Sequence, residues 1–137
     1  MKLKEIIKGV EVKVVGSSDV EVDNIQFDSR QVTRGTLFVA QRGTKVDGHA
    51  FIERTVEDGA VAVVCEELPM TLRTGVTYVQ VSNSSCALGQ MAANFYGHPS
   101  EKLKLIGITG TNGKTTIVTL LHRMFRMLGI QIGRAHV

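Results

Sequence analysis

The sequence Leu-Lys-Leu-Ile-Gly-Ile-Thr-Gly-Thr-Asn-Gly-Lys-Thr-Thr, residues 103–116, decides the fold of its part of the chain. Its first six residues are mostly apolar and are typical of a buried strand, and residues 117–128 carry apolar side chains at helical spacing. A strand, a glycine-rich turn and a helix in this order are the context in which a Gly-Lys-Thr sequence binds phosphate. We therefore predict a strand over residues 103–108, then a phosphate-binding loop, and then a helix that begins near Lys114.

Each residue type in this loop has a physical role. Gly110 and Gly113 permit positive φ and a close backbone approach, so that N–H groups can point at phosphate oxygens. The start of the helix adds unsatisfied N–H groups and the positive end of the helix dipole. Lys114 is predicted to contact the β and γ phosphates as the catalytic cation, and the Thr115 hydroxyl to bind Mg²⁺. The predicted ATP-binding residues are Gly110, Thr111, Asn112, Gly113, Lys114, Thr115 and Thr116.

The loop departs from the general phosphate-loop pattern in its first glycine. That pattern places a glycine at position 108, where this chain has Ile108, with glycines at 107 and 110 instead. The alternative is a glycine-rich turn that joins a strand to a helix and binds nothing. The lysine and the paired threonines favour a phosphate site over that alternative.

Composition sets the outer bounds on function. A chain of 137 residues can bury one core, or one small domain and the beginning of another. The net charge of +3 comes from scattered basic residues, which gives no reason to expect nucleic acid or an anionic membrane as a partner. No apolar run is long enough to span a bilayer and no signal-peptide core follows the first residues, so we expect a cytoplasmic protein without membrane insertion. Cys65 and Cys86 lie in apolar runs, and both are predicted to be reduced core residues.

Residues 1–97 alternate between strand-like and helix-like segments, which predicts a small α/β domain. The expected helices cover residues 2–8, 49–58 and 84–96, and the expected strands cover residues 11–15, 22–27, 36–40, 60–65 and 77–81. A Gly-His-Pro-Ser sequence then interrupts the pattern, so residues 98–102 are predicted to be a linker and residues 103–131 the start of a second domain.

Two loops of the first domain carry groups that can bind a ligand. Asp28-Ser29-Arg30 follows the strand that ends at Phe27, and Arg42-Gly-Thr-Lys-Val-Asp-Gly-His49 follows the strand that ends at Ala40. Such loops can offer N–H groups, a hydroxyl and a cation to a diphosphate or to the edge of uracil. The alternative is that both are solvated connectors, with Asp28 and Arg30 forming an exposed ion pair of little consequence. Spacing alone does not decide between these readings.

The same segments resemble a known family. Phe27-Asp-Ser-Arg30, Gly35-Thr-Leu-Phe-Val-Ala40, Gly43 and Asp47-Gly-His-Ala-Phe-Ile52 are similar to the amino-terminal domain of the Mur ligases that add the third residue of the peptidoglycan stem peptide. Phe95-Tyr-Gly-His-Pro-Ser100, followed by residues 105–116, resembles the junction between the first and second domains of these enzymes. The resemblance covers residues 1 to about 131 and points to the UDP-N-acetylmuramoyl-tripeptide synthetases.

This resemblance implies an ATP-dependent ligase that forms an amide bond and requires Mg²⁺. In the family, the γ-phosphate of ATP is transferred to the D-Glu carboxylate of UDP-N-acetylmuramoyl-L-Ala-D-Glu, and the amine of diaminopimelate or L-lysine then displaces it. The full-length enzyme is expected to be a monomer, and this fragment alone is expected to be inactive. The residues implied to hold the UDP end of the substrate are Phe27, through its backbone, and Ser29, Thr44, Lys45 and Val46.

Two alternatives stay open. The sister ligase that adds D-Ala-D-Ala has a similar first domain, but Thr111 before Asn112 and Thr116-Ile-Val118 after the Gly-Lys-Thr sequence favour the tripeptide synthetase. A nucleotide-binding module without ligase activity is the second alternative. The downstream gene sequence distinguishes them, because a ligase needs further metal ligands and a carboxyl-terminal domain that binds the amino acid.

The resemblance fails at the carboxyl terminus. One strand, loop and helix cannot bury both faces of a parallel sheet, so the expected fold is a small amino-terminal α/β substrate-binding domain followed by the first strand, phosphate loop and helix of a truncated Mur-type mononucleotide-binding domain. Residues 132–137, Ile-Gly-Arg-Ala-His-Val, resemble the translation of a common sequencing adapter. We therefore expect a truncated gene model with a non-native tail, the alternative being a natural tail in which His136 is exposed to solvent.

Overall fold

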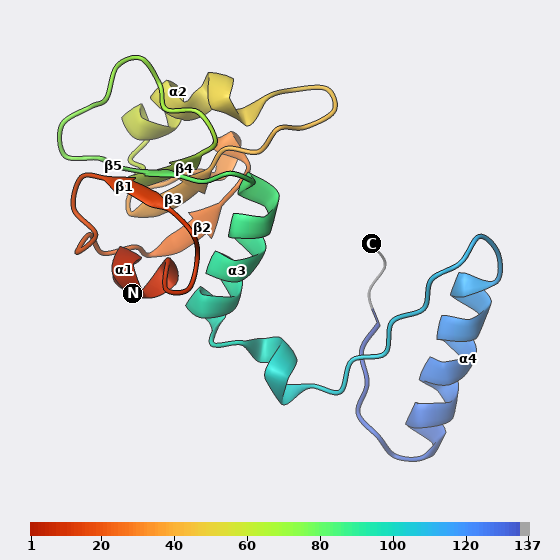
Figure 1. The fold of residues 1–137 in the computed structure, drawn as a ribbon. Coiled ribbons are helices and arrows are strands. Elements are labelled where there is room, and N and C mark those ends of the chain that lie inside the picture. Colours follow the sequence, from red (N-terminus) through yellow and green to blue (C-terminus); the bar gives the residue numbers. More distant parts are fainter. Residues whose placement is uncertain (135–137) are drawn as a thin grey trace. The chain divides into compact units, whose positions relative to one another are not determined.

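The first of the two compact units of the chain, Met1–Pro99, is built on a five-stranded sheet (Figure 1). The computed structural model describes residues 1–134. The strand order is β1-β5-β4-β3-β2; β1 runs antiparallel to β5, and all other neighbours are parallel. The strands are β1 (Lys13–Val15), β2 (Asn24–Gln26), β3 (Thr36–Val39), β4 (Ala62–Cys65) and β5 (Thr77–Gln80).

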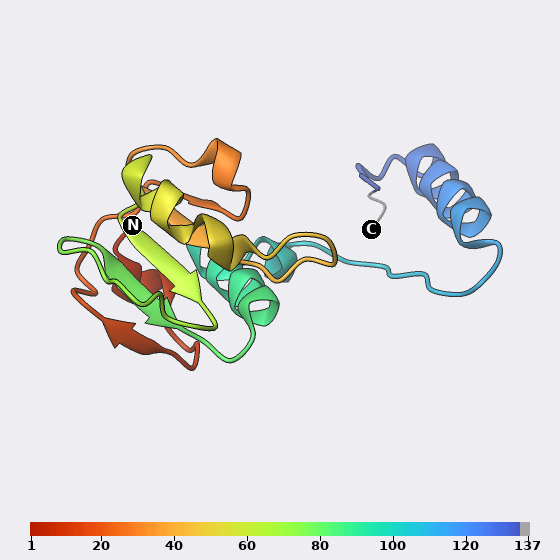
Figure 2. The same ribbon diagram turned by 90° about the horizontal axis from the view of Figure 1, so that it is seen from above.

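Helices cover both faces of this sheet. Helices α1 and α3 lie on one face and α2 lies on the other, as the views from two directions agree (Figures 1 and 2). The helices of this unit are α1 (Leu3–Ile6), α2 (Ile52–Glu57) and α3 (Ser84–Tyr96), with short 3-10 turns η1 (Ser29–Gln31) and η2 (Gly48–Phe51); a third turn, η3 (Pro99–Lys102), follows. The predicted α/β class is therefore confirmed.

The alternation of side chains along β3 explains the two cores. Leu37 and Val39 pack with α1 and α3, whereas Phe38 packs with α2 on the opposite face. All four residues of β3 are buried, as expected for a parallel strand that is covered on both sides. The same alternation in β4 places Val64 in the first core and Val63 in the second.

Among the helices and strands that formed, the helix expected over residues 49–58 differs most from the observed bounds. The structure has the 3-10 turn η2 first and then the shorter helix α2. The reason is local, because the Asp47 carboxylate accepts a hydrogen bond from the His49 N–H and so caps a tight turn. By contrast, α3 has the predicted bounds, since Asn83 caps its first turn and Gly97, with φ of +73°, ends it.

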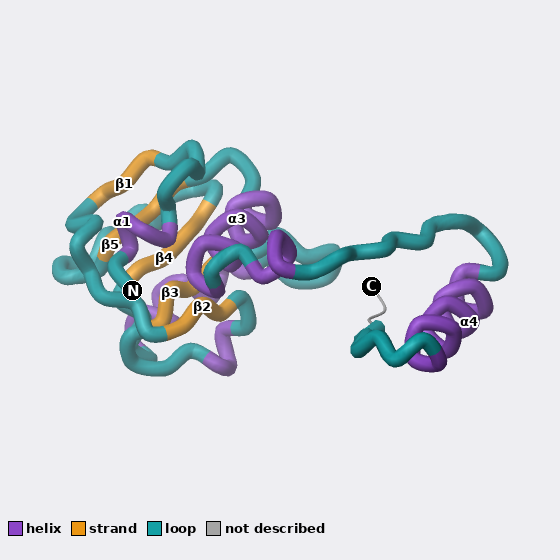
Figure 3. Tube along the Cα trace, turned by 90° about the horizontal axis from the view of Figure 1, so that it is seen from below, coloured by secondary structure: helices purple, strands orange, loops and turns teal. Residues whose placement is uncertain are grey.

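The second unit, which begins at Ser100, contains helix α4 (Lys114–Met127) (Figure 3). The strand predicted over residues 103–108 is not formed, and Leu105 is 70% exposed. A strand of a parallel sheet needs backbone partners, and within residues 1–134 no strand pairs with this segment. The last three residues of the predicted non-native tail, 135–137, lie outside the described residues, so that expectation stays a prediction.

Within residues 1–134, no helix combines the length and the apolar character that crossing a membrane requires.

The two cysteines are free but differ in burial, and this corrects the prediction that both are core residues. Cys65 lies in β4 and is fully buried, and burial raises the pKa of its thiol to about 11. Cys86 is exposed in the first turn of α3.

We therefore expect a maleimide reagent at pH 7 to modify one cysteine per native chain and two per unfolded chain. Peptide mapping should place the native label on Cys86, because the Cys65 thiol is buried and protonated. Mass spectrometry of the labelled chain measures both numbers. Rapid labelling of Cys65 in the native chain would contradict the burial of β4.

Candidate functional site

The carboxyl ends of β2, β3, β4 and β5 lie at one edge of the sheet, because these strands are parallel. We call this the carboxyl edge. In parallel α/β sheets the loops at this edge are where ligands bind. Both loops singled out from the sequence leave the sheet here, one after β2 and one after β3 (Figure 1).

The loop after β3 is a tight hairpin over residues 41–48, which we call the hairpin loop. The Gly48 N–H donates to the Gln41 carbonyl at 2.7 Å, and the Gly43 N–H donates to the Val46 carbonyl at 3.1 Å. In Figure 1 it extends beyond the start of α2. Its tip consists of the predicted substrate-binding residues Thr44, Lys45 and Val46, all of them exposed.

The close approach of the two arms of the hairpin loop requires glycine at position 48. A Cβ atom there would lie 2.8 Å from the Gln41 nitrogen and 2.9 Å from its oxygen. We expect Gly48→Ala to lower the free energy of unfolding by about 1–3 kcal/mol, the usual cost of overpacking, and to speed amide exchange at residues 41–48. Urea denaturation and hydrogen exchange measure the two effects.

Gly89→Ala is the matched control, because a Cβ at this α3 position meets nothing within 4 Å. Alanine is the better helix former by about 0.5–1 kcal/mol, so this variant should be slightly more stable than the parent chain. Equal stability of the two variants would show that the hairpin loop does not need the contact that glycine allows.

Glu66, which directly follows β4, joins the hairpin loop to the start of α3. One carboxylate oxygen accepts hydrogen bonds from the Ser84 N–H at 3.0 Å and the Ser84 hydroxyl at 3.1 Å. The other oxygen lies 2.9 Å from Arg42 Nε, and Arg42 also pairs with Glu67. The Ser84 amide, and to a lesser extent Arg42, lower the pKa of Glu66, so this carboxylate is charged at neutral pH.

His49 ties the end of the hairpin loop to the same place. Its Nε2 atom accepts a hydrogen bond from the Glu66 N–H at 2.9 Å, and its Nδ1 atom lies 2.7 Å from the Asp47 carboxylate. Gln41 forms a further tie, since its amide nitrogen donates to the Ser84 carbonyl at 3.1 Å.

Sequence reasoning quoted Asp47 and His49 only as part of a motif and missed Gln41 and Glu66. The available signal was that Gln41 and Glu66 each come directly after the apolar run of a predicted strand, where neighbouring parallel strands end together.

The loop after β2 contains a bidentate ion pair between Arg30 and Asp28. The Arg30 guanidinium donates to both oxygens of Asp28, at 2.9 and 2.7 Å, and holds the pKa of that carboxyl at about 2. Phe27 is 63% exposed, and Ser29 is half-buried at the start of η1. The ion pair considered from the sequence is therefore present.

These pairings distinguish the cations of the two loops. Arg30 is paired with Asp28, and Arg42 is paired with Glu66 and Glu67. Within the segments Asp28–Arg30 and Arg42–His49, Lys45 is the one Lys or Arg side chain for which the structure of residues 1–134 shows no ion pair. It is thus the side chain best able to meet an anionic ligand.

In the second unit, the phosphate loop has the backbone features predicted for anion binding. Gly110 and Gly113 have positive φ values of +153° and +76°. The Ile117 N–H donates to the Gly113 carbonyl at 3.0 Å as the first helical hydrogen bond, which leaves the N–H groups of residues 114–116 without helical acceptors. Residues 110–116 are all exposed, and Lys114 is the first residue of α4. This arrangement fits a phosphate group.

The predicted metal ligand, Thr115, lies in the first turn of α4. Across residues 1–134, no group of three or more His, Cys, Asp or Glu side chains is placed to hold a metal ion.

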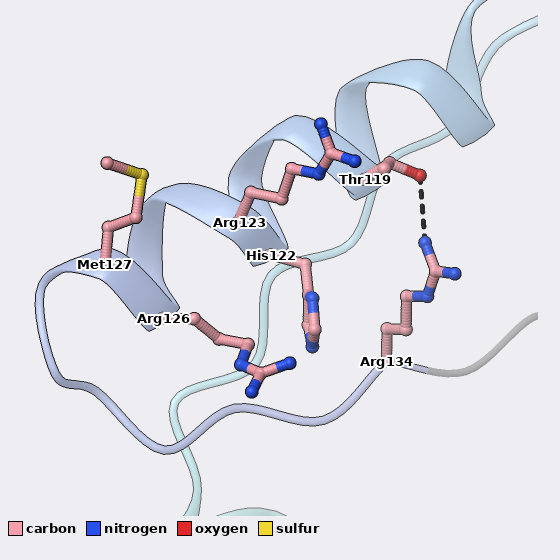
Figure 4. Close-up of a pocket in the computed structure, with 6 residues that line it drawn as sticks. All are labelled: Thr119, His122, Arg123, Arg126, Met127 and Arg134. Atoms are coloured by element: carbon pink, nitrogen blue, oxygen red, sulfur yellow. Dashed lines mark hydrogen bonds between the residues drawn. The ribbon is translucent and has the colours of Figure 1, made fainter.

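A separate cationic cleft lies along the later turns of α4 (Figure 4). Arg134 reaches back to this helix and donates to the Thr119 hydroxyl at 2.8 Å. The cleft is lined by Thr119, His122, Arg123, Arg126, Met127 and Arg134, and none of the predicted site residues is among them.

Comparison with known proteins identifies the family. The family described as "Mur ligase family, catalytic domain" matches residues 21–96, which is more than half of the chain. The chain belongs to the Mur ligase family. In this Mur ligase chain the matched residues include the hairpin loop and the Asp28–Arg30 segment, and they end before the phosphate loop.

Similar proteins of known name are diaminopimelate ligases. The UDP-N-acetylmuramoyl-L-alanyl-D-glutamate–2,6-diaminopimelate ligase of Bacteroides fragilis is 54% identical over 134 residues, or 97% of this Mur ligase chain and 28% of the relative. The ligases of the same name from Cytophaga hutchinsonii and Clostridioides difficile are 53% and 40% identical. The chain thus spans a little over a quarter of the length of these relatives.

Solved structures of MurF ligases share the fold. A MurF structure from Acinetobacter baumannii has a TM-score of 0.68 and 24% identity, covering 93% of this Mur ligase chain and 28% of that chain. A Thermotoga maritima MurF, solved in complex with ADP, has a TM-score of 0.58 and 27% identity, covering 80% of this chain and 24% of that chain.

Proposed function

We propose that this chain is the substrate-binding and ATP-binding beginning of a ligase that adds 2,6-diaminopimelate to UDP-N-acetylmuramoyl-L-alanyl-D-glutamate. The observation that carries the proposal is the 54% identity, over 97% of the chain, to the Bacteroides fragilis ligase named for that reaction. Two free cysteines agree with a reducing compartment, so we place the reaction in the cytoplasm.

The carboxyl edge of the first unit is the proposed site for the UDP end of the substrate, with residues 1–97 as the substrate-binding domain. Lys45 would meet the diphosphate, because the neighbouring arginines are already paired. The hydroxyls of Ser29 and Thr44 and the backbone of Val46 would add hydrogen bonds, and the exposed Phe27 would lie beside the uracil ring. Phe27, Thr44, Lys45 and Val46 are exposed, Ser29 is half-buried, and all of them follow the ends of the paired strands β2 and β3, which supports this assignment.

The phosphate loop is the proposed ATP site, with residues 98–102 as a linker and 103–131 as the start of the ATP-binding domain. The free N–H groups of residues 114–116 and the Lys114 ammonium would hold the phosphates, and Thr115 would be a Mg²⁺ ligand. Bound Mg²⁺ would neutralise charge on the phosphates as the γ-phosphate moves to the substrate carboxylate. The ADP complex of the Thermotoga maritima MurF supports a nucleotide site in this family.

The alternative is the D-Ala-D-Ala-adding activity. The solved structures favour it only through their shared fold, since their identity to this chain is 24–27%, compared with 40–54% for the diaminopimelate ligases. A nucleotide-binding module without ligase activity remains the other alternative, and an activity assay decides it.

The test is a chimera in which residues 1–131 of this chain replace the matching segment of the Bacteroides fragilis ligase. We expect ATP-dependent addition of diaminopimelate to UDP-N-acetylmuramoyl-L-alanyl-D-glutamate within about tenfold of the parent rate, since the exchanged segments are 54% identical. A matched chimera with a MurF ligase, at 24% identity, should be inactive. A folded chimera that binds neither ATP nor the UDP substrate would refute the proposal.

A further inference from the structure

We propose that His49, held as its Nδ1-protonated tautomer between Asp47 and the Glu66 amide, is a positioning residue that fixes the hairpin loop for the diphosphate end of the nucleotide substrate. This inference rests on the proposed function and adds a residue that contacts no substrate itself. His49 orders the hairpin loop before the substrate binds.

The hydrogen bonds of the ring determine its tautomer, and a longer one, 3.5 Å from the Glu67 N–H, also ends on Nε2. The backbone N–H of Glu66 can only donate, so Nε2, at 2.9 Å, must carry the lone pair. The proton then lies on Nδ1, which is 2.7 Å from the Asp47 carboxylate and donates to it. The Asp47 carboxylate also accepts from the His49 N–H at 2.9 Å, so ring and backbone are held by one acceptor. The His49 side chain is only 14% exposed, which limits competition from water.

The position of His49 in the chain makes this tie effective. His49 directly follows the hairpin loop, whose other arm begins at Gln41, two residues after the end of β3. Through Nε2 the ring joins the far arm to the end of β4, while Arg42 joins the near arm to the Glu66 carboxylate at 2.9 Å. Both arms are thus anchored on one residue, and the tip with Lys45 is held out at the carboxyl edge.

A loop that is ordered in advance binds its ligand more tightly, because less conformational entropy is lost on binding. The tip residues 44–46 have no buried side chains to hold them, so their order depends on the arms. Loss of the Nε2 acceptor leaves the Glu66 N–H without a partner and removes the tie between the far arm and the end of β4.

Two substitutions separate the two nitrogen atoms. In His49→Gln the amide oxygen can reach the position of Nε2 and still accept from Glu66, whereas in His49→Asn the shorter amide can reach only the position of Nδ1. We expect the affinity of the 137-residue chain for UDP-N-acetylmuramoyl-L-alanyl-D-glutamate to fall about fivefold to tenfold in His49→Asn and to stay within about twofold in His49→Gln. Titration calorimetry measures the affinities, and thermal unfolding confirms that both variants are folded.

A second measurement needs no substrate. Long-range proton–nitrogen NMR spectra of the free chain should identify Nε2 as the unprotonated ring nitrogen of His49, and the Gly43 and Gly48 amides should exchange about tenfold faster in His49→Asn than in His49→Gln. If the parent chain binds no UDP substrate while the NMR results hold, the proposed function fails and the bracing of the loop stands. A protonated Nε2, or equal exchange in both variants, overturns the role of His49, as does unchanged affinity in His49→Asn.

Discussion

Replacing Lys114 with alanine in the Bacteroides fragilis chimera is expected to lower the turnover number by about 10²- to 10³-fold, the usual effect of removing one group that stabilises transition-state charge. Lys114 opens α4, where the N–H groups of residues 114–116 have no helical acceptors. Phosphoryl transfer depends on positioning and charge neutralisation rather than on covalent chemistry by the protein. The ammonium group is the one mobile positive charge in the phosphate loop, residues 107–116, and neutral groups cannot replace it.

Release of inorganic phosphate at saturating substrates measures this effect. Lys104→Ala is the control, because Lys104 is also exposed but lies before the phosphate loop, and its loss should change turnover by less than about twofold. A second variant, Lys114→Arg, keeps the charge but changes its shape, and should recover only part of the activity. If Lys114→Ala retained more than a tenth of the parent activity, the loop would not be the ATP site.

The elements of the first unit were predictable because their sequence signals are local and agree with their surroundings. Residues 37–39 and 62–65 form continuous apolar runs of the kind that mark parallel strands covered on both faces, and both are fully buried. The predicted bounds of α3 agree with the structure, in which Asn83 caps the first turn and Gly97, in the left-handed conformation, ends the helix. The helix after the phosphate loop was predicted from the helical spacing of its apolar residues, and the structure has it as α4.

The prediction of a strand over residues 103–108 was wrong, and the sequence of that segment alone does not contain the reason. Its apolar residues have the composition of a buried strand, but backbone pairing comes from other segments, and residues 1–134 supply none. Cys86 was misplaced for a related reason, since an apolar run in a helix does not say which side of each turn faces the sheet. Ala87 and Met91 of α3 are buried, while Cys86 faces solvent.

Residues of a candidate site can be proposed from sequence when they are consecutive and form one motif. The phosphate loop is such a motif, because ten consecutive residues, 107–116, supply the glycines, the lysine and the hydroxyls. The network around Glu66 is different, because it joins segments that follow three strands: Arg42 and His49 after β3, Glu66 after β4 and Ser84 after β5. Each of these residues is ordinary in its own stretch of sequence. Only the pairing of β3, β4 and β5 brings them within hydrogen-bonding distance.

Phe38→Ala is expected to have the largest effect on stability, lowering the free energy of unfolding of the first unit by about 3–5 kcal/mol. Phe38 lies in β3, between two parallel neighbours, and is 1% exposed in the core that α2 covers. Alanine would remove most of the ring and leave a cavity that the rigid strands on both sides cannot close. Because small domains are stable by only about 5–15 kcal/mol, this loss should bring the chain close to unfolding at 37 °C.

Urea denaturation followed by circular dichroism measures the change, and Phe27→Ala gives the matched control. The two phenylalanines lie in or just after neighbouring strands, but Phe27 is 63% exposed, so its removal should alter the unfolding free energy by no more than about 0.5 kcal/mol. The difference between the two changes in unfolding free energy distinguishes a buried phenylalanine from an exposed one. Phe38 packs the sheet against α2, whereas we expect the exposed Phe27 to contribute little to stability and to be available for ligand contact at the carboxyl edge. Equal losses from the two substitutions would mean that β3 is not the centre of a two-sided core.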